Sequence, residues 1–575
     1  MPFSSSWSTD RALVQRYAAS RGQVDATPEL EDAWHSPTSP SSPFPGGEDR
    51  PLLASRISPA VNHVSSAGKW AQDSDNDHSR PTPTINVTES TPLIPHEPSG
   101  GSARPGDRQE WWSEVRTLCA FTLPVLGTHI CEYSLSIAPV ISTGHISTEA
   151  LAAVTLGTMT ASVTGFSIII GFSTALDTML PSAWTSGTPS LVGLWTLRMF
   201  VLMTAILIPI AMLWLNAEVI LLALRQEPEI AKLAGIYLRW FMLGLPAYAF
   251  NAIVRRFFQS QGLFSAPTRI VVIVAPINIL LNWLLVWGPD WIRLGFIGAP
   301  IATAISLNLT SCLYTFYGLW FTSKVAWHPV NKECLHDLRR LFRLGFAGVA
   351  QIAAEWWSWE LCGLVASQIG SLELAVQSVL LVSASTSYQA PYALSSATSV
   401  RVGNMLGARN ARGAALATRV SIFLSFIVAL LMSAVFLLFR KNWAYMFNDD
   451  PYVVKEVAHI LPLVALFQIF DGLGAITGAI LRALGKQDIG AMLSLVGYYA
   501  FGIPLGIVLA FKAGLGLEGL WVGLTLALVF VGVTGLYICT IRTNWETEVH
   551  KAMVRLGHEQ EEPPRNATTT SNVVP

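Results

Sequence analysis

Two carboxylates interrupt an otherwise apolar segment of this chain, and three tryptophans surround them. Glu355 and Glu360 lie in the run Gln-Ile-Ala-Ala-Glu-Trp-Trp-Ser-Trp-Glu at 351–360, inside a segment long enough to cross a membrane. An ionised carboxylate costs about 2.5 kcal/mol or more at the centre of a bilayer, so acids at such depth are functional by default. Removing a carboxyl group from water favours its neutral form, which lets it take up a proton near neutral pH. The indoles would attract an aromatic or cationic ligand.

Helical spacing separates these two acids. Gln351, Glu355 and Trp359 recur every four residues and share one stripe. Glu360 follows Glu355 by five residues and points roughly 140° away, so only one acid looks directly into a shared cavity. We predict that Glu355 binds a proton; the alternative is a structural acid bonded to Ser, Tyr or backbone groups. The predicted ligand contacts on this helix are Gln351, Trp356 and Trp359.

Asp471 is the second candidate for proton binding. It lies in the middle of the apolar run Leu-Phe-Gln-Ile-Phe-Asp-Gly-Leu-Gly at 466–474, with Gln468 on a similar face. Two carboxyl groups that face one cavity titrate as a pair. We therefore predict that Glu355 and Asp471 act together, the alternative for Asp471 being a bond to a neighbouring helix.

The remaining polar residues of the apolar segments are weaker candidates. Glu373 begins the eighth segment, where an interfacial position also explains it, and Glu132 lies inside the first. Asp177 lies at the inner end of the second segment, where we expect a cap or loop contact. Tyr498 and Tyr499 fit a cavity lining and ordinary packing equally well.

Composition places the chain in a membrane. Of its 575 residues 51% are hydrophobic and only 13% are charged, against about 25% charged in soluble proteins. The net charge of −1 indicates no nucleic-acid partner. The six cysteines, together with His129 and His145, show no metal-ligand or disulfide spacing. No P-loop or enzyme signature is present, so an ATP-driven pump and an enzyme are not indicated, and transport would use an ion gradient or be passive.

The apolar pattern predicts an all-α membrane protein with twelve spans, each near the ~20 residues that a bilayer requires. The expected spans are 117–140, 150–174, 191–213, 233–254, 268–288, 296–322, 342–368, 374–397, 415–439, 457–481, 489–511 and 516–541. They divide into six-helix halves at 111–330 and 331–545, which short similarities at an offset of about 220 residues relate as repeats.

Lys and Arg near the span ends favour one orientation. Roughly twenty fall on one side and about eight on the other, which predicts that both termini are cytosolic. Residues 1–110 and the tail at 546–575, from about Thr547, are polar and lack an apolar period, so we expect them to be disordered.

Several motifs within about 111–545 resemble those of the multidrug and toxic compound extrusion (MATE) family. The most specific is Ser-Val-Arg-Val-Gly-Asn-Met-Leu-Gly-Ala at 399–408, after the eighth span. The acid-and-tryptophan run at 355–360 is similar to the seventh-helix signature of eukaryotic members. The other matching segments are 175–178, 255–262, 480–487 and 519–523.

The resemblance implies a V-shaped carrier of two six-helix bundles, working as a monomer, that exports small organic compounds in exchange for H+ or Na+. It implies proton coupling by Glu355 and Asp471 and substrate handling by Glu360 and Glu373. The family's Gln-Ala-x-Gly-Ala run after Asp177 is replaced by 181–187, which leaves a gating contact there open. Bacterial members carry an acid where this chain has 138–140, so H+ is favoured over Na+. No cofactor is implied.

Three alternatives remain open at this point. The first is a Na+-coupled exporter, and the second is a flippase for lipid-linked substrates, which a strongly basic cavity would favour. The third is a receptor or channel, against which the repeated halves and paired acids speak. Two acidic dileucine patterns in the N-terminal tail resemble vacuolar sorting signals read by an adaptor, so a vacuolar membrane is favoured over the plasma membrane. Their key residues are Glu48, Leu52, Leu53, Glu89, Leu93 and Ile94.

Overall fold

The computed structural model describes residues 105–447 and 449–557, and every regular element among them is helical. Most of the predicted N-terminal tail, both dileucine segments and the last residues of the chain lie outside this part. The predicted boundary at residue 110 is wrong by several residues, because the first described helix already begins at Pro105. Two contacts join the first turns of this helix to the second half of the chain. Glu114 forms an ion pair with Arg401, and the ring centroid of Trp111 lies 5.8 Å from that of Phe423.

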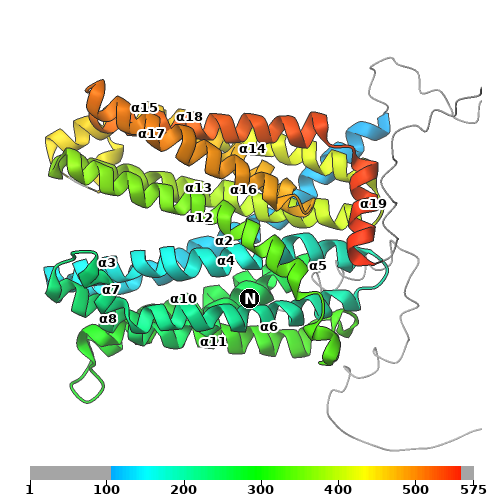
Figure 1. Cartoon of the computed structure of the whole chain (residues 1–575), viewed down its shortest axis with the longest axis horizontal. Helices are drawn as coiled ribbons and strands as arrows, with labels where there is room; N and C mark the ends of the chain where they lie inside the picture. Colours follow the sequence, from blue (N-terminus) through cyan, green and yellow to red (C-terminus); the bar gives the residue numbers. More distant parts are fainter. Residues whose placement is uncertain (1–104, 448, 558–575) are drawn as a thin grey trace, which may run out of the picture. The chain divides into compact units, whose positions relative to one another are not determined.

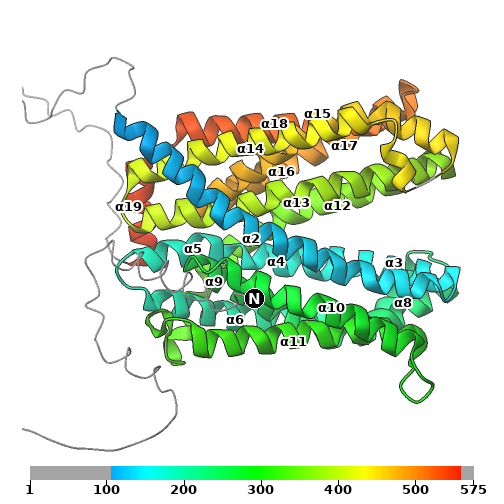
Figure 2. The ribbon, with the colours of Figure 1, turned by 180° about the vertical axis from the view of Figure 1, so that it is seen from behind.

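The first half of the described chain contains ten α-helices. Helices α10 and α11 lie side by side in Figures 1 and 2, and α2 crosses obliquely toward the second half in Figure 2. Their bounds are α2 Pro105–Gly144, α3 Thr148–Ala161, α4 Ser167–Ser173, α5 Ala175–Thr185, α6 Ser190–Leu215, α7 Ala217–Ala223, α8 Pro228–Phe241, α9 Leu245–Ser260, α10 Ser265–Trp287 and α11 Gly298–Phe321.

The second half contains eight more α-helices among the described residues. Their bounds are α12 Leu338–Ile369, α13 Ser371–Gly407, α14 Ala411–Phe439, α15 Pro451–Ala483, α16 Gln487–Leu495, α17 Ile503–Ile507, α18 Gly516–Tyr537 and α19 Trp545–Leu556. Four π-helical segments interrupt or end the long helices, at Ser162–Phe166, Val496–Gly502, Val508–Lys512 and Ile538–Arg542. Short 3₁₀ turns are Met242–Gly244, Gly295–Ile297, Lys324–Ala326, Lys332–Leu335 and Trp443–Met446.

Nine helical stretches of the described residues are long and apolar enough to cross a membrane. They are Thr148–Thr185, Ser190–Leu215, Pro228–Ser260, Ser265–Trp287, Gly295–Phe321, Ala411–Phe439, Pro451–Ala483, Gln487–Lys512 and Gly516–Arg542. The other three expected spans fall in α2, α12 and α13, which are long helices but carry more polar side chains. A count of twelve spans therefore stays a prediction.

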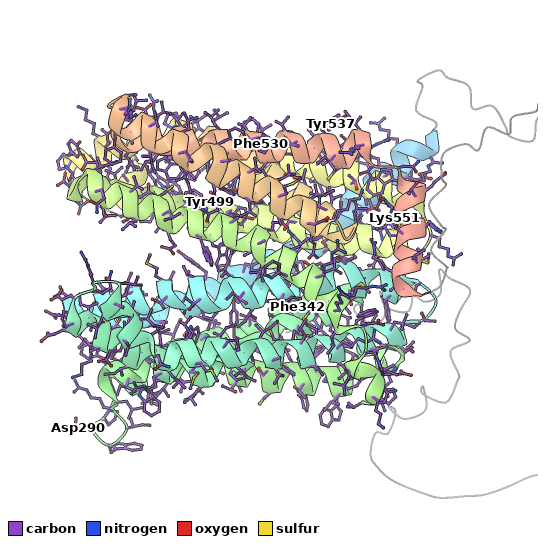
Figure 3. All side chains as sticks on the ribbon, viewed as in Figure 1. Asp290, Phe342, Tyr499, Phe530, Tyr537 and Lys551 are labelled. Carbon is purple, nitrogen blue, oxygen red and sulfur yellow. The ribbon has the colours of Figure 1, made fainter. Side chains whose placement is uncertain are left out.

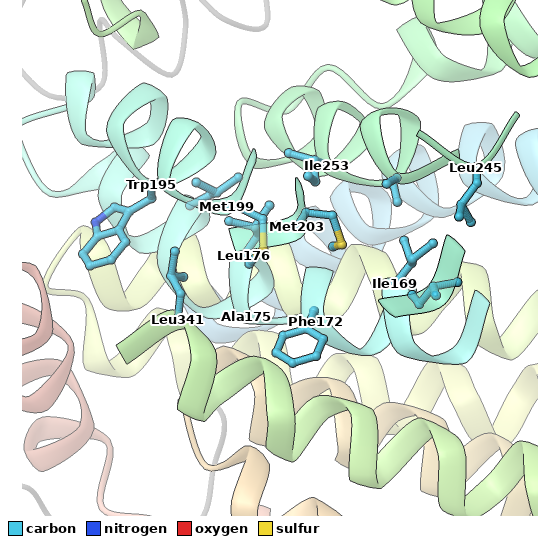
Figure 4. Close-up of a cluster of buried hydrophobic side chains, with 14 of the residues drawn as sticks. Ile169, Phe172, Ala175, Leu176, Trp195, Met199, Met203, Leu245, Ile253 and Leu341 are labelled. Atoms are coloured by element: carbon cyan, nitrogen blue, oxygen red, sulfur yellow. The ribbon is translucent and has the colours of Figure 1, made fainter. Parts of the chain in front are cut away.

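Each half has its own apolar core. The core of the first half gathers residues such as Leu176, Met199 and Ile253, as Figure 4 shows. Leu341, from the start of α12, lies in this same cluster. Helix α12 therefore begins among residues of the first half and continues into the second, where Cys362 and Ala366 join another core. This crossing brings the acid-bearing helix against both halves.

The predicted disorder of the C-terminal segment from Thr547 is wrong for 547–556, because α19 occupies it. The side chain of Asn544 accepts hydrogen bonds from the backbone N–H groups of Glu546 and Thr547, which caps the helix. Ala552 and Met553 are buried in a core of the second half. The segment is polar overall, and for this reason its composition predicted disorder. It is an amphipathic helix, whose apolar face is covered by the other helices. In Figure 1, α19 lies across the ends of the other helices.

Candidate functional site

The predicted stripe of α12 faces α15 and α16. The side chain of Gln351 lies 2.8 Å from the position that a Cβ would take on Gly478 of α15 and 3.1 Å from that on Gly490 of α16. A Cβ at either position would crowd the amide of Gln351, so the two glycines give this side chain room. Glu355 is one turn further along α12 and is half-buried. The glycines thus let polar groups of α12 enter the space between α15 and α16.

The structure brings Glu355 and Asp471 together, as the sequence predicted. Asp471 is only 7% exposed, and the two carboxyl groups are close enough to interact electrostatically. The charge of Arg482 also acts on Glu355. The phenol groups of Tyr388 and Tyr498 are close enough to both acids to interact with them electrostatically. This acid pair, Glu355 with Asp471, is the charged centre of the second half.

Hydrogen bonds fix the helices around the acid pair. Gln468, fully buried one turn before Asp471, accepts a hydrogen bond from Ser387 of α13 at 2.8 Å. The buried Ser358 hydroxyl donates to the backbone carbonyl of Glu355 itself at 2.6 Å. The amide oxygen of Gln468 and the hydroxyl of Ser358 are thus paired within the protein, whereas the buried amide nitrogen of Gln468 and amide oxygen of Gln351 have no hydrogen-bond partner among the described residues.

The other predicted ligand contacts occupy different surroundings. Trp359 packs against the apolar core, with its ring 5.4 Å from that of Phe467 and 5.6 Å from that of Trp521. Trp359 therefore has a packing role, and its predicted contact with a ligand stays a prediction. Trp356, Glu360 and Glu373 are half-buried. Tyr499 is also half-buried and lies within the second half, as labelled in Figure 3.

Glu132 belongs to a separate cluster in the first half. Both of its carboxylate oxygens accept hydrogen bonds from the guanidinium of Arg255, and His129 lies 3.5 Å away. The ring of His129 makes an edge-to-face contact with the ring of Tyr392. The ring centroid of Tyr392 lies 5.8 Å from that of Tyr388. An aromatic bridge therefore separates Glu132 from the acid pair, and its charge is already compensated by arginine.

The cap or loop contact predicted for Asp177 is wrong. Asp177 lies in the first turn of α5 and accepts a hydrogen bond from Arg256 of α9 at 2.9 Å. Its other oxygen lies 3.4 Å from Nε of Arg482, at the end of α15. Pattern reasoning considered only the local backbone, whereas the partners of Asp177 come from helices remote in sequence.

Further polar contacts join the two halves around Asp177. Thr178 donates to the backbone carbonyl of Arg482, and Gln487 donates to that of Thr174 at 3.0 Å. Ser182 and Thr185 donate to the carbonyls of Gly403 and Asn404 at 3.2 and 2.6 Å. We call this set of contacts between α5 and the second half the α5 junction. Gly403 and Asn404 belong to the motif after the eighth predicted span, so that motif forms a contact surface between the halves.

Sequence reasoning missed Tyr388 and the role of Arg482. Tyr388 follows the run Ser-Ala-Ser-Thr-Ser at 383–387, whose polarity within a long helix was an available signal. Arg482 was noticed only as part of a motif. Its ion-pair partner Asp177 lies 305 residues earlier in the sequence (482 − 177 = 305), so no local pattern predicts this contact. Among the described residues, no group of three or more His, Cys, Asp and Glu side chains could hold a metal ion.

Comparison with known proteins agrees with this architecture. The MatE family model matches residues 124–284 and 349–508, once in each half. An uncharacterized transporter of Schizosaccharomyces pombe is 38% identical over 442 residues, which are 77% of this chain and 82% of that protein. Multidrug and toxin extrusion protein 2 of Mus musculus is 32% identical over 445 residues, 77% of each chain. The crystal structure of the eukaryotic MATE transporter AtDTX14 superposes with a TM-score of 0.74 at 30% identity, covering 78% of this chain and 100% of that one.

Proposed function

Because this chain belongs to the MATE family of membrane transporters and is not an enzyme, we propose that it exports organic compounds in exchange for H+. The observation that carries the proposal is the acid pair, since two interacting carboxyl groups inside apolar helices bind and release protons as a unit. The names of relatives support extrusion of drugs and toxins. The substrate class proposed here is organic, with aromatic or cationic character.

Alternating access would use the acid pair as follows. With the site open to the cytosol, ionised Glu355 and Asp471 favour a cationic or polar ligand. On the acidic side of the membrane, protons neutralise the carboxylates and weaken that attraction, so the ligand leaves. A ligand shifts the two states only by its differential affinity for them, so proton and substrate must compete. The half-buried Trp356, Glu360, Glu373 and Tyr499 are proposed to shape the ligand site.

The experiment uses purified full-length protein in liposomes with an imposed pH gradient. Uptake of a fluorescent organic cation is followed for the native chain, for Glu355→Gln and for Asp471→Asn. Glu456→Gln is the matched control, because Glu456 lies on the same helix α15 but fifteen positions before Asp471. Gradient-driven uptake should be lost in both acid variants and kept in the control.

Different outcomes separate the proposal from its alternatives. Uptake that requires Na+, or that survives both substitutions, would place coupling elsewhere and reject the proton role of the acid pair. Current through the protein without saturable exchange would indicate a channel. Transfer of a lipid-linked sugar across the bilayer, with no uptake of the cation, would support a flippase. Substrate affinity that stays constant between about pH 5 and 8 would contradict competition with protons.

We further propose twelve spans in two six-helix bundles, with both termini in the cytosol and delivery to the vacuolar membrane. The charge bias of the loops and the dileucine patterns of the tail support this placement. The location of a fluorescent fusion of the full-length protein tests the proposed delivery to the vacuolar membrane. Leu52→Ala with Leu53→Ala, combined with Leu93→Ala and Ile94→Ala, should redirect the protein to the plasma membrane, whereas unchanged vacuolar fluorescence would reject the signals.

A further inference from the structure

One carboxylate of the α5 junction is shared by two arginines from different halves. Asp177 accepts from Arg256 of its own half at 2.9 Å, and its second oxygen lies 3.4 Å from Arg482 of the other half. The three side chains are between 12% and 15% exposed, so water screens them weakly. Asp177 thus has one partner within its own half, Arg256, while Arg482 is the partner that connects the halves.

Arg482 also lies on the same face of α15 as Asp471, the member of the acid pair that belongs to this helix. It follows Asp471 by eleven residues, which is close to three helical turns. Gly478 lies between them, and a Cβ there would stand 3.5 Å from the Arg482 guanidinium and 2.8 Å from Gln351. Gln351 is one turn from Glu355 on α12. A continuous polar stripe therefore runs from Asp471 past Glu355 and Gln351 to Arg482 and on to Asp177.

We propose that Arg482 is a positioning residue of the transport cycle, which transmits the charge state of Glu355 to the α5 junction. The inference rests on the proposed function, in which Glu355 gains and loses charge. One cation faces two anions, Glu355 in its own half and Asp177 in the other. When Glu355 is ionised it competes with Asp177 for Arg482. When a proton or a cationic substrate neutralises Glu355, Arg482 is left to Asp177 and the junction tightens.

The charged and titratable groups around Arg482 are consistent with this competition. Arg482 forms an ion pair with Asp177 of α5, which it shares with Arg256 of α9. It interacts electrostatically with Glu355 of α12 and Tyr388 of α13, and Asp471 of its own helix interacts with Glu355. Among these, only the carboxyl groups of Asp177, Glu355 and Asp471 can carry a negative charge near neutral pH, and the proposed competition depends on whether Glu355 is protonated. A second ion pair between the halves, Glu114 with Arg401, has no such link to Glu355 in the contacts that define it.

The test measures how readily the junction opens. Ser182 is 2% exposed and bonds across the junction, so Ser182→Cys reports opening by its rate of maleimide labelling. The variant is made in full-length protein whose six native cysteines are replaced by alanine, and is studied in lipid nanodiscs. Glu355→Gln imitates the neutral acid and should slow labelling about fivefold or more, the lower end of typical coupling between sites.

The same substitution is then repeated without Arg482. In Arg482→Gln the labelling should be fast, and Glu355→Gln should no longer change it. Arg401→Gln is the matched control, because it also breaks an ion pair between the halves. In the Arg401→Gln background the labelling rate should also rise, but adding Glu355→Gln should still lower that rate about fivefold. Arg482→Lys keeps the charge and should keep part of the effect.

Two results would overturn the inference. Equal slowing by Glu355→Gln with and without Arg482 would show that the signal travels by another route. No slowing in the native background, combined with loss of gradient-driven uptake, would reject the inference while the proposed function stands. Slowing that depends on Arg482, with uptake intact in Glu355→Gln, would instead reject the proposed function. If Arg482→Gln does not fold, Asp177→Asn removes the other partner and must abolish the effect equally.

Discussion

The indole N–H of Trp357 donates to the backbone carbonyl of Val163 at 3.3 Å, and so joins the acid-bearing helix to the first half of the chain. Val163 lies in the π-helical segment Ser162–Phe166 that interrupts the second predicted span. A π-turn leaves backbone carbonyls misaligned within the helix, and such turns often occur at functional sites. Here one of these carbonyls receives its partner from the neighbouring helix α12.

We expect Trp357→Phe to lose this bond while keeping most of the apolar contact. The stability loss should be about 0.6 kcal/mol, the average for hydrogen bonds between membrane helices. Thermal unfolding in nanodiscs measures it. Trp291→Phe is the control, because Trp291 is 85% exposed and should not respond. A loss beyond about 2 kcal/mol would mean that the ring, not the bond, matters here.

The ion pair of Glu132 and Arg255 should be sensitive to single substitution. Glu132→Gln leaves the guanidinium of Arg255, 19% exposed, without its anion. Breaking a buried pair from one side costs about 3–5 kcal/mol, and the 27% exposure of Glu132 should reduce this to about 2 kcal/mol.

Removing both charges tests the cause of that loss. The double variant Glu132→Gln with Arg255→Gln should recover more than half of the stability, because no unpaired charge remains. Glu110→Gln, in an exposed pair, should change stability by less than ~0.5 kcal/mol. A double variant less stable than either single one would contradict the assignment of Glu132 as a charge partner.

Gly348 on α12 should not tolerate a side chain. A Cβ there would approach the backbone carbonyl of Gly171 at 2.5 Å, so alanine must push α12 away from α4. We expect Gly348→Ala to cost about 1–3 kcal/mol of stability. Gly363 of the same helix has nothing within 4 Å of its Cβ position, so Gly363→Ala should be neutral or slightly stabilising. Similar losses for both would indicate that helix flexibility, and not close packing, decides.

The cap of α19 offers a fourth prediction. Asn544→Ala removes the acceptor of two backbone N–H groups and should cost about 1 kcal/mol, confined to this helix. Hydrogen exchange of the amides at 545–556 should become severalfold faster, with no change in the amides of α15. Uniformly faster exchange in both helices would show instead that α19 is essential to the whole fold.

The half-buried Arg555 of α19 should change the free energy of unfolding by the same amount at every pH near neutrality. Burial lowers the pKa of the Arg555 guanidinium to about 10, below its value in the unfolded chain. The carboxylate of Glu548 opposes this shift, and the charge of Arg340 adds to it. The cost of burying this charge is thus fully present below pH 10 and is relieved only above it. The stability difference between the native chain and Arg555→Met should therefore be constant from pH 5 to 8. A difference that varies across this range would assign the titration to another group.

The sequence by itself determined the class of the protein and singled out Glu355 and Asp471, the two candidate acids that the structure brings together. Apolar length makes membrane spans visible without any partner, since the bilayer imposes the same requirement on each segment separately. Glu355 and Asp471 were found because a charge inside such a segment is anomalous by itself. The family motifs at 399–408 and 480–487 belong to this same local kind of information.

Only the tertiary structure decided which charges meet. Asp177 reads locally as a helix-end residue, yet its partners come from α9 and α15. The ring contacts of Trp359 with Phe467 and Trp521 join residues of three different helices. The polar segment at 547–556 is a helix because the bundle covers Ala552 and Met553. Ion pairs, ring contacts and the burial of an amphipathic face depend on distances between remote segments, which a one-dimensional pattern does not contain.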